Sequence, residues 1–210
     1  MPNLKRVAWF VVFLTVPTVL GQSEKNSLPV NYLIFKVSDQ SVDTDQARLD
    51  QFLAESYGLT SEVASYSVSY PDLAYRITDG WEFHKYAALE GELIYYHKTD
   101  LFVRTTDGDS FRITKQSFAA GLSVAGRYPL MKNLYLYGKA GAAFWRTDSD
   151  REGGDGALPD KVHEDNVEPS LGAGVRWSLS SNMVFDLSYE QNQVDGLDVN
   201  TITLGIGFRY

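Results

Sequence analysis

Three histidines, His84, His97 and His163, are the side chains of this sequence best suited to act as general bases near neutral pH. A catalytic nucleophile needs such a base within hydrogen-bond reach and a third group that orients the base. None of the three histidines lies two residues before a serine, which is the spacing of a His-x-Ser arrangement. We therefore predict that they are not catalytic and that the protein is not an enzyme.

Acidic residues gather between positions 147 and 166, where their carboxylates could bind a hard cation. The group consists of Asp148, Asp150, Glu152, Asp155, Asp160, Glu164 and Asp165. Its spacing differs from the alternating Asp residues, Gly and final Glu of an EF-hand. The chain has no cysteine, which excludes thiolate metal sites and disulfides. We predict a solvated acidic loop, with no metal or cofactor site.

The first 21 residues have the pattern of a secretory signal peptide, with Lys5 and Arg6 before an apolar run that Pro17 ends. The apolar segment 7–20 is shorter than the roughly 20 residues that a membrane-spanning helix needs. We predict a signal peptide over residues 1–21 and one domain over 22–210. Removal of the signal leaves 17 basic and 27 acidic residues and a net charge of −10, which disfavours nucleic-acid binding.

Strict alternation of apolar with small or polar residues is the strongest structural signal, and it is clearest at the carboxyl terminus. Ile206, Phe208 and Tyr210 alternate with glycine and Arg209. Side chains of a strand point to opposite faces with a period of two, so this pattern predicts a strand with one apolar face. Eight segments show such a pattern, the first less clearly, at residues 30–38, 64–77, 85–98, 115–128, 134–146, 167–178, 183–193 and 199–210.

The connections between these segments alternate in length. Short turns are expected at residues 78–84, 129–133 and 179–182, and longer loops at 39–63, 99–114 and 147–166, with 194–198 a short last member. Transmembrane barrels have short periplasmic turns and longer outer loops. The pattern predicts an all-β fold, an eight-stranded antiparallel up-and-down transmembrane β-barrel with both termini in the periplasm. Helical spacing of Leu49, Phe52, Leu53 and Tyr57 in the first loop indicates local packing.

Periodicity alone leaves open whether the apolar face points to lipid or, as in a lipocalin-like barrel, inward to a ligand. The opposite face decides for lipid, because it combines small residues with charges of both signs that can pair inside a narrow lumen. We predict a lumen charge network of Glu90, Glu92, Arg127, Lys139, Arg176, Asp186, Glu190 and Arg209. Aromatic girdles are expected from Tyr86, Tyr128, Trp177 and Tyr210 at the periplasmic end and Tyr95, Phe144 and Tyr189 at the outer end.

At this point the chain resembles the OmpA-type and OmpX-type eight-stranded outer-membrane barrels. The resemblance rests on YAALEGELIYY, on SFAAGLSVAGRYPLMKNLYLYGKAGAAFWRTD, on PSLGAGVRWSLSSNMVFDLSYE and on the terminal TITLGIGFRY. It implies a salt-bridge network in the lumen, in which Glu90, Lys139, Glu190 and Arg209 occupy matching kinds of position. It also implies that Ile206, Phe208 and Tyr210 form a signal for the barrel-assembly machinery. Because the chain ends at the barrel, no peptidoglycan-binding domain is expected.

These patterns together predict a non-enzymatic protein of the bacterial outer membrane, in contact with membrane lipid and lipopolysaccharide. Its function is expected to be structural or to lie in surface recognition, with a ligand bound by the acidic outer loops. A small-solute pore is one alternative, which is disfavoured because side chains fill an eight-stranded lumen. A lipid A-modifying barrel enzyme is the other, and the neighbours of the three histidines disfavour it. His97 is the histidine that this alternative would need, since it lies at the outer end of a lipid-facing register.

Overall fold

The structure is a computed structural model that describes residues 30–43, 46–59, 63–69, 73–153, 161–194 and 197–210. The signal peptide predicted for residues 1–21 lies outside these described residues. The elements, in chain order, are β1 (Val30–Asp43), α2 (Gln46–Tyr57), β2 (Val63–Ser69), β3 (Leu73–His84), β4 (Ala87–Tyr96), β5 (Thr99–Thr105), β6 (Ser110–Met131), β7 (Leu134–Gly153), β8 (Lys161–Ser178), β9 (Met183–Val194) and β10 (Leu197–Arg209).

Eight of these strands close into an antiparallel barrel, as predicted. Their order around the barrel is β1, β3, β4, β6, β7, β8, β9 and β10, and β1 pairs with β10 to close it. At the closing seam Phe35 lies opposite Ile206, and on its other side it lies opposite Ile77. The apolar alternation of the last strand therefore continues into the first and third strands, so that their exposed apolar side chains lie side by side on this part of the wall.

The predicted segment 64–77 proves to be two strands with different partners. β2 pairs with β5 and leaves the barrel, whereas β3 lies in the barrel between β1 and β4. The prediction of a single strand over residues 64–77 was therefore wrong, although residues 70–72 themselves lie outside the described part. The predicted turn 78–84 is also strand, because Thr78 and Gly80 pair with β1 and β4. The chain turns later, at Lys85 and Tyr86.

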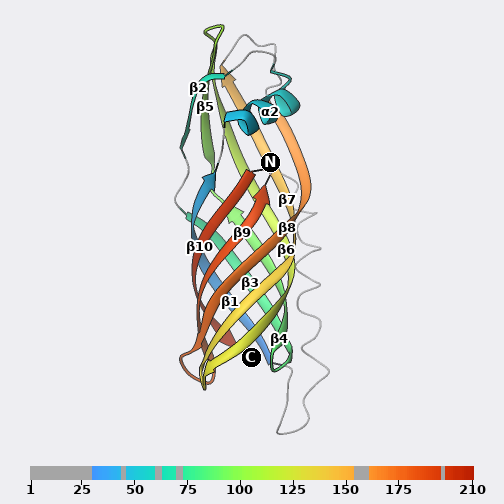
Figure 1. Ribbon diagram of the computed structural model, residues 1–210, viewed down its shortest axis with the longest axis vertical. Helices are drawn as coiled ribbons and strands as arrows, with labels where there is room; N and C mark the ends of the chain where they lie inside the picture. The colour runs from blue at the N-terminus through green and yellow to red at the C-terminus, as the bar shows by residue number, and fades with distance from the viewer. Residues whose placement is uncertain (1–29, 44–45, 60–62, 70–72, 154–160, 195–196) are drawn as a thin grey trace.

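The strands extend well past the barrel at the end opposite the short turns. Residues 99–114, predicted as a loop, form the β5–β6 hairpin, and β7 and β8 continue through most of the predicted loop 147–166. We call this protruding unit the extension: β2, α2, β5 and the adjoining parts of β6, β7 and β8, at the top of Figure 1. Its hairpin turns at Asp107 and Gly108, where the positive φ of Gly108 (92°) favours glycine.

The extension has a hydrophobic core of its own. Leu53 and Tyr57 of α2 pack on Leu101 of β5 and on Phe111 and Ile113 of β6. The helix ends at Tyr57, and Gly58 follows it with a φ of 69° and an N–H group that donates to the Ala54 carbonyl at 3.0 Å. The helical spacing noticed in the sequence thus marks a real helix, held on the inward face of the protruding sheet. Within the described residues, no helix has the length and apolarity needed to cross a bilayer.

The barrel wall carries large exposed apolar side chains on its outside and aromatic residues near both ends. The predicted girdle residues are exposed as expected, with Tyr86, Tyr128, Trp177 and Tyr210 near the short turns and Tyr95, Phe144 and Tyr189 near the extension. Inward-facing positions are polar or small at mid-barrel. This inversion, with apolar groups outside and charges inside, is the arrangement of a barrel that lies in lipid.

Candidate functional site

Eight charged side chains meet inside the barrel, four of each sign, and we call them the lumen network. The cations are Lys36, Arg76, Lys139 and Arg176, and the anions are Glu90, Glu92, Asp186 and Glu190. The Lys139 Nζ atom lies 2.8 Å from a Glu190 oxygen and 3.3 Å from a Glu92 oxygen. Lys36 lies 3.5 Å from Asp186, and Arg76 pairs with Glu190. Equal numbers of opposite charges allow these buried groups to remain ionised together.

Arg176 lies at the end of this network nearer the short turns and is held by rings as well as charges. Its guanidinium bonds to Glu90 at 3.0 Å and to Asp186 at 2.9 Å. The same group lies 4.5 Å from the ring centre of Tyr32 and 4.7 Å from that of Tyr137. Cation–π contacts add to the two ion pairs, so this part of the lumen is a packed cross-section.

A layer of apolar side chains lies on the other side of the network, toward the extension. The rings of Tyr96 and Trp145 pack at a tilt of 39° with their centres 5.2 Å apart, beside Ala74, Ile94 and Ala119. Besides the ionic network, the described lumen therefore contains this apolar layer and a second buried apolar cluster, which consists of Tyr32, Ile34, Ala88, Ala125 and Val184.

The structure places six of the eight predicted lumen residues in the network: Glu90, Glu92, Lys139, Arg176, Asp186 and Glu190. The other two, Arg127 and Arg209, lie at the barrel end with the short turns, where both approach Glu82. Arg127 also lies 5.3 Å from the ring centre of Tyr135. These two residues form a separate small cluster at the mouth of the barrel.

Sequence reasoning missed Lys36, Arg76 and Glu82. Lys36 lies in a nearly continuous apolar segment, where period two gives no register, but a lone charge there could itself have marked the inward face. Arg76 lies between Tyr75 and Ile77, and its alternation was visible. It was overlooked because its segment was treated as continuous with β2.

The three histidines lie apart from the network and from one another. His97 packs edge-on against Tyr75 and Tyr95, with ring centres 5.5 and 5.6 Å away, on the outer surface of the wall. His84 accepts a hydrogen bond from the backbone N–H of Tyr86, and His163 bonds to Asp148 at 2.7 Å. His97 thus occupies an aromatic girdle.

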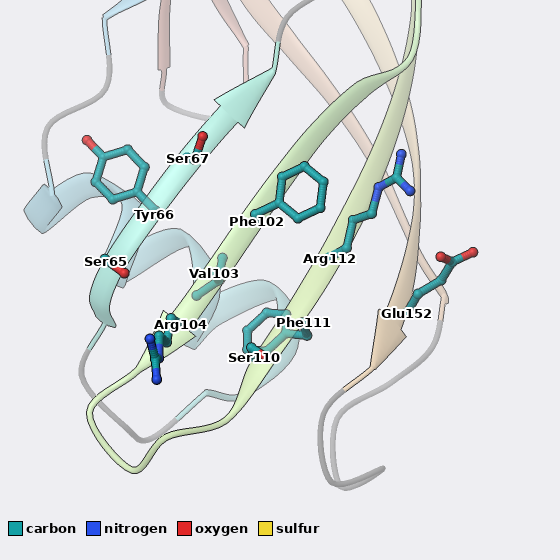
Figure 2. A pocket seen from close by; sticks show the side chains of 10 residues that line it. All are labelled: Ser65, Tyr66, Ser67, Phe102, Val103, Arg104, Ser110, Phe111, Arg112 and Glu152. Carbon is teal, nitrogen blue, oxygen red and sulfur yellow. The ribbon is translucent and has the colours of Figure 1, made fainter.

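The outward face of the extension carries a groove of about 410 Å³ across β2, β5, β6 and β7 (Figure 2). The exposed ring of Phe102 lies at its centre, with the Arg112 guanidinium 5.3 Å from the ring centre. Arg112 and Thr114 donate hydrogen bonds to the carboxylate of Asp100 at 2.5 and 2.7 Å, and these bonds lower the pKa of Asp100. The groove thus combines an aromatic ring, a fixed guanidinium and hydroxyl groups.

Beside the groove, the outward face of β7 is acidic. Asp148, Asp150 and Glu152 alternate along it and are exposed. Lys161 lies 3.4 Å from Asp150 across the β7–β8 pair, but both side chains are more than half exposed. Two further members of the predicted acidic loop, Glu164 and Asp165, lie in β8. Asp155 and Asp160 lie outside the described residues. Among the described residues, no three or more His, Cys, Asp or Glu side chains come together as metal ligands would.

The predicted assembly residues Ile206, Phe208 and Tyr210 all face outward at the end of β10. Tyr210 continues the closing seam through two backbone hydrogen bonds with Asn31, of 3.0 and 3.3 Å. Its hydroxyl donates to Asp79 at 3.0 Å.

Comparison with known proteins shows the family to which this barrel belongs. Residues 8–210 match the family described as the outer membrane protein beta-barrel domain. The chain belongs to this family. It is 22% identical to the attachment invasion locus protein of Yersinia enterocolitica over 84% of this chain and 89% of that protein. It is 25% identical to the virulence membrane protein PagC of Salmonella typhimurium over 91% of this chain and 90% of that protein.

Among solved structures, the attachment invasion locus protein Ail of Yersinia pestis has a TM-score of 0.54 at 16% identity, over 88% of this chain and all of Ail. Ail has also been solved with the heparin analogue sucrose octasulfate (TM-score 0.52). These likenesses confirm the fold, and the family confirms the predicted resemblance to outer-membrane barrels.

The protein is therefore an outer membrane protein of the Gram-negative envelope, in a family with envelope- and virulence-related members. The names of these relatives describe attachment, invasion and virulence, and none describes an enzyme. Barrels of this class contact membrane lipid and lipopolysaccharide through their apolar wall. The barrel end with the short turns is accordingly the periplasmic end, and the extension is the outer end.

Proposed function

We propose that this protein is a non-enzymatic surface-recognition protein, in which the barrel anchors the extension and the extension binds partners outside the cell. One observation carries the proposal: the outer part is a folded unit with its own buried core. Leu53 and Ile113 are fully buried in it, which surface loops without a role in recognition do not require. A rigid surface loses less conformational entropy on binding than a flexible loop does.

The charge of the extension supports a partner with basic character. Asp148, Asp150 and Glu152 share one outward face, and their nearest cations are exposed and can exchange partners. An acidic face attracts basic surfaces over a screening length of about 8 Å at physiological salt. This face lies beside the groove of Figure 2, so one partner could contact both.

The pore and the enzyme receive less support. The described lumen is crossed by the ionic layer and the apolar layer, which favours a closed barrel over an open channel. The three histidines are spread over the periplasmic turn, the aromatic girdle and the extension, so they do not form a shared catalytic site.

The test compares bacterial adhesion with and without the acidic face. The double variant Asp150→Asn/Glu152→Gln should fold, as shown by heat-modifiable gel migration, and should bind less to surfaces coated with a lysine-rich protein. The control Glu55→Gln/Asp109→Asn changes the charge equally at exposed positions on α2 and the β5–β6 turn. Binding should fall only in the first variant, and added salt should reduce the difference.

A second candidate partner is an anionic polysaccharide, because Ail was solved with sucrose octasulfate and both Arg104 and Arg112 of this chain line the groove. Adhesion to immobilised heparin tests it with Arg104→Ala. Loss of heparin binding in Arg104→Ala, with unchanged adhesion of the acidic-face variant, would favour the anionic partner over the basic one. Unchanged adhesion of both variants to both surfaces would contradict recognition by this face.

A further inference from the structure

The lipid-facing wall has a hollow of about 440 Å³ where β6, β7, β8 and β9 lie side by side. Its floor includes Gly138 and Ala140 on β7 and Ala173 on β8, whose outward positions carry almost no side chain. A Cβ atom added at Gly138 would come no closer than 3.8 Å to another atom, so the space above it is open. We call this feature the lipid-facing hollow.

The opposite wall is built differently. There β1, β3 and β10 expose large apolar side chains over most of their lipid-facing length: Phe35, Val37, Leu73, Tyr75, Ile77, Ile202, Leu204, Ile206 and Phe208. Small residues at alternate positions of β7 therefore reduce the side-chain bulk in this sector of the wall. In a bilayer such a space is filled, because an empty one forfeits dispersion contacts on all its sides.

The hollow has a polar end and an apolar end. Gln191 and Tyr189 of β9 line it on one side, and the Tyr189 hydroxyl donates to Asn200 at 2.7 Å in the outer aromatic girdle. Val124 and Gly138, on β6 and β7, line the side that lies halfway along the lipid-facing part of those strands. The hollow thus runs obliquely from the outer boundary of the membrane toward its middle.

This polarity matches a lipid of the outer leaflet. The amide and ester carbonyls of such a lipid lie near the membrane surface and its chain ends lie at the bilayer centre. Gln191 can donate a hydrogen bond to a linkage carbonyl at the outer end. The wall on either side is already the interface with lipid, so the hollow continues an established contact surface.

We propose that the lipid-facing hollow is a seat for one acyl chain of lipid A, with Gln191 bonding to the linkage carbonyl of that chain. A second copy of this barrel fits poorly, because Val124 and Leu171 stand at the rim of the hollow, each more than half exposed. They would hold another convex wall away from the floor, whereas a flexible chain can lie between them. Lipid A is the expected source because it forms the outer leaflet that faces this end of the hollow.

The test fills the hollow with a larger side chain and measures how much lipid A stays bound to the purified protein. Protein is extracted from outer membranes in mild detergent, and lipid A per folded barrel is measured by mass spectrometry. Gly138→Leu should reduce retained lipid A about tenfold, the effect of losing roughly two buried methylene groups. Gln191→Leu should reduce it as well, since the polar end is lost. The control Val37→Leu adds side-chain bulk on the opposite wall and should leave retention unchanged.

Ala140→Leu fills the same space and replaces Gly138→Leu if the latter fails to fold, as judged by heat-modifiable migration. A parallel experiment refolds the protein in vesicles of phospholipid with and without lipid A. Equal retention by the filled and wild-type proteins would overturn the proposal. So would retention of phospholipid in preference to lipid A, or cross-linking of two barrels through β7 that Gly138→Leu abolishes.

Discussion

Tyr32 lies across the backbone of Gly80, on the neighbouring strand, so closely that a Cβ atom at Gly80 would coincide with ring atoms of Tyr32. The hydroxyl of Tyr32 donates to Glu90, and its ring faces Arg176. Gly80 is therefore required by the packing of the lumen, because it leaves room for the ring that helps to hold Arg176.

Gly80→Val should destabilise the barrel by about 1–3 kcal/mol, the usual effect of overpacking a filled interior. The ring would have to move, and its hydrogen bond to Glu90 would be lost with it. Urea midpoints of refolded protein measure the effect. Gly126→Val is the control, because a Cβ atom there comes no closer than 4.0 Å to another atom, and it should change the midpoint little. Equal midpoints for both variants would show that Tyr32 is not fixed by Gly80.

Lys139→Ala should lower the urea midpoint much more than Lys161→Ala. Lys139 is buried between Glu92 and Glu190, and removal of one partner from a buried pair costs about 3–5 kcal/mol. Lys161 pairs with Asp150 where its side chain is 72% exposed, and such pairs are worth about 0–1 kcal/mol. Similar losses would place Lys139 in contact with solvent.

Deletion of Phe208–Tyr210 should leave the protein in the periplasm and sensitive to protease, if these residues direct outer-membrane assembly. The deletion also removes seam bonds between Tyr210 and Asn31, so stability must be separated from assembly. The purified variant, refolded in detergent, should still show heat-modifiable migration. Normal outer-membrane yield of the truncated chain would contradict an assembly signal at this end.

The extension should lose stability in acid through Asp100. Hydrogen bonds from Arg112 and Thr114 lower the pKa of this carboxyl, so the stabilisation is complete above the pKa of the unfolded chain. It is lost as the pH falls through the lower pKa of the folded state. An NMR titration of the Asp100 carboxyl in wild type and Arg112→Gln measures this, and the variant should titrate at higher pH. The same midpoint in both proteins would exclude Arg112 as the cause.

The barrel strands could be predicted because the alternation that marks each strand is visible within a short stretch of sequence. In the segment from Thr201 to Tyr210, each residue shows its face by alternation, and the same holds for residues 134–146 of β7 and for β9. The mixed charges opposite the apolar positions then decide which face meets lipid. Six lumen residues were placed in this way from sequence alone.

The extension could not be predicted in the same way, because alternation shows the face of a strand but not its neighbour. β2 and β3 follow each other closely, and only their pairing with β5 and β1 reveals that one leaves the barrel. A local signal for the β5–β6 hairpin did exist, in Asp107–Gly108 between the alternating pairs Leu101, Val103 and Phe111, Ile113. The acidic segment 147–166 was likewise treated as loop because its charges mask the alternation of β7, although Ser149 and Arg151 face inward there.

β6 and β7 run without interruption from the periplasmic turn into the extension, over 22 and 20 residues, and stay paired along almost all of that length. A force that pulls the extension away from the cell, such as flow past an attached bacterium, would act along these strands. Their backbone hydrogen bonds lie across the direction of pull, so many would have to shear together rather than open one after another. The barrel and the extension are thus one continuous mechanical element, and α2 and β2 should detach under load long before the barrel does.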